Sequence, residues 1–131
     1  FTVPAGSLGG KLGRSRTIRI GLAGLAVLML LGGFAIQGVV TFIIALVIAG
    51  AFWALVNVNS LPLVYDFGDE RKIGAYTGLY YFSSQLAAIL GPSLSGLLVD
   101  LLNDQYRWVW PFSAVFMALA WLIMRKVSKP T

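Results

Sequence analysis

The sequence predicts an all-α membrane protein in which four hydrophobic helices cross a bilayer. Of the 131 residues, 58% are hydrophobic and 11% are charged, whereas soluble domains carry about 25% charged residues. The mean hydropathy is +0.83. The apolar residues form continuous runs close to the roughly 20 residues that a helix needs to cross a hydrocarbon core of about 30 Å. Continuous runs favour helices, because membrane-spanning strands alternate apolar and polar residues.

The four predicted spans cover residues 18–37, 39–65, 73–99 and 108–124. Residues 1–19 are interpreted as the end of a preceding helix followed by a glycine-rich basic loop. Gly38 breaks the chain between the first two spans, and polar loops at 66–72 and 100–107 separate the others. Residues 125–131 form a basic tail. The chain begins at Phe1 without an initiator methionine, so we expect that its start is truncated.

The positions of lysine and arginine predict the orientation of the spans. With four crossings, nine of the ten basic residues fall on one side of the membrane and only Arg107 on the other. Segments rich in lysine and arginine stay on the cytoplasmic side. We therefore expect a multi-pass protein of the plasma (inner) membrane, with the loop at 9–19 and the tail at 125–131 in the cytoplasm.

Residue types that the chain lacks exclude several functions. Without cysteine or histidine, a thiolate or imidazole metal site and Cys or Ser–His catalysis are excluded. We therefore expect that the chain is not an enzyme and that it has no metal site and no cofactor. The predicted spans also lack charged residues in the hydrocarbon region, where coupled carriers usually keep a carboxylate. Topology accounts for the net charge of +5, so we expect the lipid bilayer and not nucleic acid as the partner.

A polar stripe marks the third span as a candidate wall of a solute cavity. At 100° per residue its members fall within an arc of about 100°: Thr77, Tyr81, Ser84, Gln85, Ala88, Pro92 and Ser95. For the small residues we favour packing between helices. For Tyr81 and Gln85, near the middle of the membrane, we favour a cavity, because an unsatisfied polar group in hydrocarbon is costly.

The second span offers Trp53 and Asn57 at depths that match Gln85 and Tyr81. Aromatic and amide groups can stack on and hydrogen-bond a polar, uncharged solute such as a sugar. We therefore predict a solute site built from Trp53, Asn57, Tyr81, Ser84 and Gln85. A buried amide satisfied by a neighbouring helix is the alternative for the second span.

Gly91 and Pro92 form a predicted hinge in the third span. Proline removes a backbone hydrogen bond and clashes with the preceding turn, and bent helices are where transporters move and bind. A static kink is the alternative.

The segment from Gly6 to Ile18, GSLGGKLGRSRTI, resembles the signature loop of the major facilitator superfamily, G-x-L-(A/G)-D-(R/K)-x-G-R-(R/K). Six residues match in register: Gly6, Leu8, Gly9, Lys11, Gly13 and Arg14. Arg16 supplies the last basic residue one position late, because Ser15 stands at that place. Gly10 stands where the signature has aspartate. In that family the loop joins the second and third helices, and a degenerate copy joins the eighth and ninth. Loss of the aspartate favours the degenerate copy. A generic basic loop is the alternative.

The resemblance implies that residues 1–131 are helices nine to twelve of a twelve-helix transporter that works by alternating access. The phrases YTGLYY, from Tyr76, and LGPSLSGLLVD, from Leu90, resemble the sugar–cation symporter branches, so the implied solute is a sugar or glycoside. The coupling proton or sodium ion would then bind elsewhere in the protein. Gly91-Pro92 also resembles the antiporter motif of the fifth helix, which leaves a first-half assignment open.

The resemblance further implies a gate at the inner side of the membrane. In the resembled fold, an arginine of the signature loop pairs with an acid at the end of the helix after next. Here that acid is Asp66, and its partner is Arg14 or Arg16.

Two other functions stay open at this point. One is a membrane assembly factor on the same fold, which the absence of any solute uptake would favour. The other is a self-contained four-helix membrane protein, which an upstream sequence encoding about eight further spans would eliminate.

Overall fold

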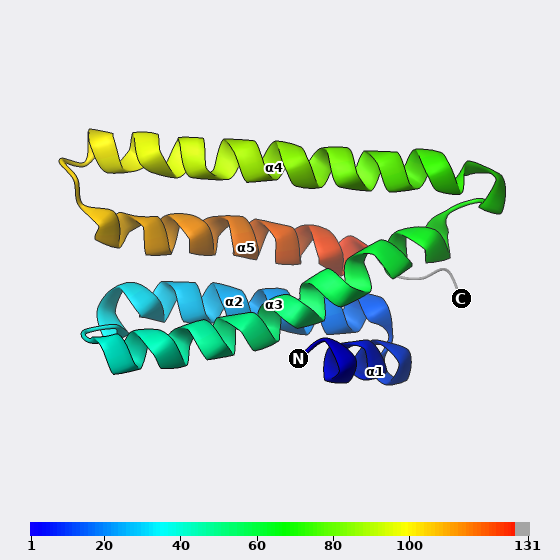
Figure 1. Ribbon diagram of the computed structural model, residues 1–131, viewed down its shortest axis with the longest axis horizontal. Helices are drawn as coiled ribbons and strands as arrows, with labels where there is room; N and C mark the ends of the chain where they lie inside the picture. The colour runs from blue at the N-terminus through cyan, green and yellow to red at the C-terminus, as the bar shows by residue number, and fades with distance from the viewer. Residues whose placement is uncertain (128–131) are drawn as a thin grey trace.

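The computed structural model describes residues 1–127 as a set of α-helices joined by short connections (Figure 1). The helices are α1 (Thr2–Leu12), α2 (Arg14–Ala35), α3 (Val39–Phe67), α4 (Ile73–Leu101) and α5 (Val109–Lys126). Single 3-10 turns, η1 (Glu70–Lys72) and η2 (Tyr106–Trp108), precede α4 and α5. The four long helices are long and apolar enough to cross a membrane. The prediction of an all-α fold with four membrane-spanning helices is thus confirmed.

The connection between α1 and α2 is much shorter than the loop expected at residues 9–19. Helix α1 continues to Leu12 and α2 begins at Arg14. Only Gly13 separates them, with a φ of 88°. A residue with a side chain rarely adopts that conformation, whereas glycine adopts it freely. Glycines in this segment suggested a loop, but Gly9 and Gly10 lie within a helix. At the other end of the chain, α5 includes Arg125 and Lys126, and residues 128–131 of the expected tail lie outside the described part.

The two ends of the helix bundle differ in charge, and the orientation predicted from that charge stays a prediction. The turn before α3 and the loop before η2 lie together at the left of Figure 1, and the α1–α2 connection, η1 and the end of α5 lie at the right. Asn103 and Asp104 turn the chain at the left end with φ values of 55° and 60°, which asparagine and aspartate tolerate better than most residues. Arg107 lies at this end, and the other basic residues of the described part lie toward the right end.

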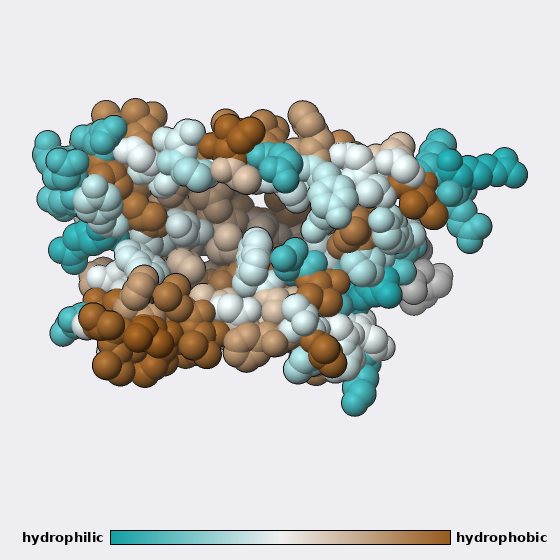
Figure 2. Space-filling model, in the orientation of Figure 1, coloured by the Kyte–Doolittle hydropathy of each residue, from teal (hydrophilic) through white to brown (hydrophobic). Residues whose placement is uncertain are grey.

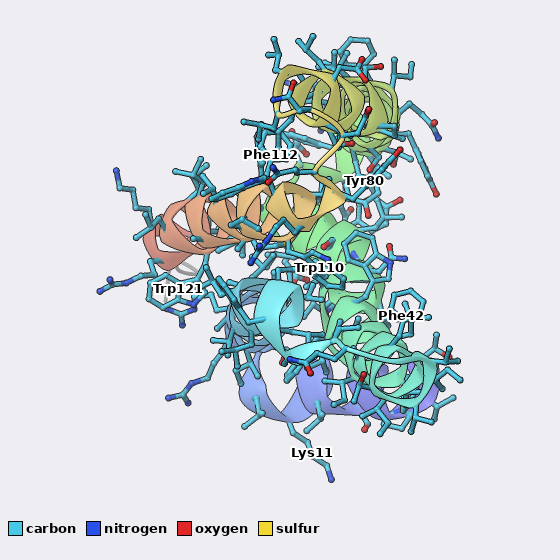
Figure 3. All side chains as sticks on the ribbon, turned by 90° about the vertical axis from the view of Figure 1, so that its left-hand side faces the viewer. Lys11, Phe42, Tyr80, Trp110, Phe112 and Trp121 are labelled. Carbon is cyan, nitrogen blue, oxygen red and sulfur yellow. The ribbon has the colours of Figure 1, made fainter. Side chains whose placement is uncertain are left out.

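Helix α2 is the centre of the packing. It packs against α1, α3 and α5. Small residues bring the helices close: a Cβ atom at Gly21 would lie 2.7 Å from the Phe52 carbonyl oxygen of α3. At the opposite end, the ring of Trp110 from α5 occupies the space beside Gly32, and Figure 3 shows this ring between the two helices. Close packing over small residues is typical of membrane helices, which associate through van der Waals contacts because the hydrophobic effect does not drive helices together within lipid.

Much of the apolar surface faces outward. Figure 2 shows a brown area at the lower left, over the first half of α3. The residues exposed there include Val39, Val40, Phe42, Ile43, Ile44, Leu46 and Val47. Helix α4 is also exposed, and Val99 is its one buried residue. In a bilayer such faces are covered by lipid or by further helices.

Candidate functional site

An ion pair joins α2 to α3 at the basic end of the bundle. The Arg14 guanidinium Nη1 lies 3.1 Å from Oδ1 of Asp66 and donates a second hydrogen bond, of 2.9 Å, to the carbonyl oxygen of Pro62. Both side chains are about one-third exposed, at 38% for Arg14 and 31% for Asp66. The pairing expected for Asp66 with Arg14 or Arg16 is therefore present, with Arg14 as the partner. A gating role for the pair stays a prediction.

Pro62 positions this site, although no role was predicted for it from the sequence. Proline has no backbone N–H, so α3 loses one internal hydrogen bond in the turn that precedes Pro62. Figure 1 shows that α3 changes direction in its second half, toward α4. Asp66 lies one helical turn beyond Pro62, so a single guanidinium reaches both the carboxylate and the proline carbonyl. A proline inside an apolar run is the signal that could have revealed the bend.

A buried amide fastens α1 to α3. Asn59 is 3% exposed, and its Nδ2 donates to the carbonyl oxygens of Ala5, at 3.1 Å, and Leu55, at 2.9 Å. Gly9, one turn after Ala5, leaves the space that the Asn59 side chain fills. No role was predicted for Asn59 from the sequence. Small residues four apart, such as Ala5 and Gly9, are the pattern that indicates close helix contact.

The five residues of the predicted solute site lie on two helices that separate from each other. Trp53 and Asn57 are exposed on α3, and Tyr81, Ser84 and Gln85 are exposed on α4. Helices α3 and α4 meet near their shared connection, where the Tyr65 hydroxyl lies 3.0 Å from that of Thr77. Farther along, α5 lies between α4 and the first half of α3 (Figures 1 and 3). Within residues 1–127, no hydrogen bond joins the α3 group to the α4 group.

Trp53 instead lines a cavity of about 400 Å³ between α2, α3 and α5. The other residues of its wall are Leu25, Met29, Leu46, Ala49, Gly50, Ser113 and Met117. This wall is almost entirely apolar. The assignment of Trp53 and Asn57 to a polar solute site thus stays a prediction.

The predicted hinge lies in an unbroken helix. Helix α4 continues through Gly91 and Pro92 to Leu101, and Figure 1 draws it without a sharp bend. Gly91 and Pro92 line a groove of about 640 Å³ between α4 and α5. Phe112 and Phe116 form the α5 side of that groove, and Figure 3 shows Phe112 between the two helices. The structure shows no kink here, and the hinge role stays a prediction.

The described polar and charged residues are suited to hydrogen bonding and to forming ion pairs. Within residues 1–127, no three acidic side chains gather into a group that could hold a metal ion. Charged side chains lie at the helix ends and in the connections, and the exposed middle of α4 carries hydroxyl and amide groups.

This architecture of long apolar helices with charged ends defines an integral membrane protein. The whole chain, residues 1–131, matches the Major Facilitator Superfamily, and the chain belongs to that family. Over 100 residues it is 32% identical to the MFS-type efflux transporter pyiT of Pyricularia grisea. The aligned part is 73% of this chain and 14% of that transporter, so the chain spans a small fraction of its relative's length. No solved structure matches it significantly.

Proposed function

We propose that the chain is the C-terminal part, helices nine to twelve, of a transporter that moves a small solute across the membrane by alternating access. The observation that carries this proposal is the contact of Arg14 with Asp66 and the Pro62 carbonyl, at 3.1 and 2.9 Å. It joins the segment that resembles the signature loop to the bent end of α3. A contact of this kind stabilises one arrangement of the helix ends and opens when the other arrangement forms.

The polar stripe of α4 supplies the solute-facing wall in this proposal. Tyr81, Ser84 and Gln85 are exposed in the middle of a helix whose described neighbours leave it largely uncovered. Polar groups at that depth need protein, water or solute as partners. Lining a water-filled path satisfies them and gives them a function.

We infer that the solute is a small, polar, uncharged molecule. Symport of a sugar or glycoside is the leading candidate function. Gln85 offers amide donors and an acceptor, and Tyr81 and Ser84 offer hydroxyl groups, which together suit the alcohol groups of a sugar. The coupling proton or sodium ion binds outside this chain, since the middle of its helices carries no carboxylate.

Efflux of a less polar compound is the second candidate function. The relative from Pyricularia grisea is named as an efflux transporter. The groove between α4 and α5 is mostly apolar, with aromatic rings on its α5 side. An amphipathic compound could place its apolar part in this groove and its polar part on Ser84 or Gln85.

A flux measurement on the full-length protein in proteoliposomes separates these candidates. With an inward proton or sodium gradient, we expect saturable accumulation of a radiolabelled disaccharide or glycoside. If the protein instead expels an amphipathic dye and accumulates no sugar, the efflux candidate replaces the sugar one. If the reconstituted protein moves neither class, an assembly factor on the same fold is favoured.

The Asp66→Asn variant tests the gate in the same assay. An exposed ion pair contributes roughly 0–1 kcal/mol, so we expect little loss of thermal stability. Up to about 1 kcal/mol shifts the balance of two access states by as much as about fivefold, and we expect the transport rate to change accordingly. Glu70→Gln, which removes a carboxylate from the turn that follows α3, should leave the rate unchanged. Equal rates in Asp66→Asn and the unaltered protein would count against the gate.

A further inference from the structure

The residues that line a cavity at the basic end of the bundle carry a net positive charge. It has a volume of about 580 Å³ and lies between α1, α2, α3 and the end of α5. Three arginines, Arg14, Arg16 and Arg19, and one carboxylate, Asp66, line it. Three positive charges less one negative charge leave a surplus of two. Arg14 is engaged by Asp66, so the surplus belongs to Arg16 and Arg19.

The start of α2 adds to the positive potential of this cavity. Gly13 precedes the helix without a capping side chain, and the first turn contains no acidic residue. The first backbone N–H groups of a helix have no partner within the helix, and the helix dipole is positive there. The first turn instead contains Arg14, Ser15 and Arg16, which line the cavity.

The walls of the cavity combine this charge with open space and apolar surface. A Cβ atom added at Gly10, on the α1 side, would meet nothing within 4 Å. Leu12 and Leu63 supply apolar surface. The Ser15 hydroxyl donates a hydrogen bond of 2.6 Å to the Val127 carbonyl oxygen, which holds the end of α5 against this wall. The cavity thus has a closed side, a charged lining and room for a group of several atoms.

We propose that this cavity binds a phosphate group, held by Arg16 and Arg19 beside the start of α2. Guanidinium groups match phosphate oxygens in a two-pronged geometry and keep their charge at all physiological pH values. The cavity lies at the end of the bundle where anionic headgroups concentrate around cytoplasmic basic residues. A phosphate of an anionic phospholipid and free inorganic phosphate both have the required chemistry. This site is independent of the solute and of the direction of transport.

Lipid binding to the full-length protein in detergent tests the proposal. Phosphatidylglycerol, phosphatidylcholine and inorganic phosphate are titrated separately, and bound lipid is counted by native mass spectrometry. We expect the double variant Arg16→Gln, Arg19→Gln to lose about tenfold or more in affinity for phosphatidylglycerol, because two charge-assisted contacts disappear. The matched control, Arg71→Gln with Lys72→Gln, removes two positive charges from the same end but outside the cavity. Its affinity should stay within about twofold.

A second pair of variants alters Gly10, and only one member of the pair adds a charge. Gly10→Asp places a carboxylate in the open space of the cavity, and we expect it to weaken phosphatidylglycerol binding severalfold, while Gly10→Asn leaves it unchanged. Competition by millimolar inorganic phosphate identifies a soluble ligand, and its failure to compete identifies the lipid. Equal losses in the two double variants would overturn the proposal. Equal binding of phosphatidylglycerol and phosphatidylcholine by the unaltered protein, together with no binding of inorganic phosphate, would also overturn it.

Discussion

Replacing Gly9 with alanine is expected to lower the free energy of unfolding by about 1–3 kcal/mol, the usual cost of overpacking a filled interior. A Cβ atom at Gly9 would collide with the Asn59 carboxamide, whose Cγ would be only 2.8 Å away. Asn59 is buried and holds α1 through the Ala5 carbonyl oxygen. If its side chain moves to make room, that hydrogen bond breaks and a buried amide loses a partner. Thermal unfolding of the purified full-length protein in detergent measures the change.

Gly10 provides a matched control one residue further along the same helix. A Cβ atom there meets nothing within 4 Å, and alanine is better than glycine inside a helix by about 1 kcal/mol. Gly10→Ala is therefore expected to leave the melting temperature unchanged or to raise it. If the two alanine variants melt at the same temperature, Asn59 does not pack over Gly9 as described.

Replacing Gln85 with leucine is expected to reduce the affinity for the transported solute. Gln85 is exposed in the middle of α4 beside Ser84. If its amide binds solute, its loss removes one or two hydrogen bonds, worth about 1–3 kcal/mol. That corresponds to a roughly 5- to 150-fold loss of affinity at 1.4 kcal/mol per decade. The concentration dependence of uptake or efflux, in cells that express equal amounts of protein, measures the loss.

Leu86→Gln is the control for this substitution, since Leu86 lies on the opposite, apolar side of α4. Leucine keeps the bulk of Gln85, so the Gln85→Leu protein should reach the membrane at normal levels. Normal transport by Gln85→Leu would remove this residue from the solute site. A variant that fails to accumulate in the membrane would show that Gln85 holds helices together.

The membrane-spanning helices were predictable because uninterrupted apolar runs have few other structures available to them. The contact between Arg14 and Asp66 was predictable from the resemblance, because the loop motif and the acid both occur at the corresponding places. The bend of α3 was also accessible, because Pro62 stands inside an apolar run. These features depend on local sequence or on a motif.

Contacts between helices were not predictable in the same way. Glycines at 9 and 10 looked like a loop, since nothing local reveals that Asn59, some fifty residues later, packs over one of them. Similarly, the helical periodicity of the second and third spans identified their polar faces. It did not give the position of α5, which separates much of α4 from α3. Which helices are neighbours depends on the whole bundle. Two parts of the polar side of α4 meet described helices, since Thr77 contacts Tyr65 and Pro92 lines the groove with α5, whereas Tyr81 and Gln85 are exposed.

The central claim is that the polar face of α4 lines a solute path. Solvent access to this face tests that claim most directly. The chain contains no cysteine, so a single cysteine at Ser84 can be labelled with an impermeant thiol reagent in the full-length protein, after any cysteines outside this chain are replaced. The proposed path predicts labelling at position 84 that transported solute slows, and no labelling of a cysteine at Leu86 on the apolar side. Labelling at 86 but not at 84, or labelling at 84 that solute leaves unchanged, would contradict it.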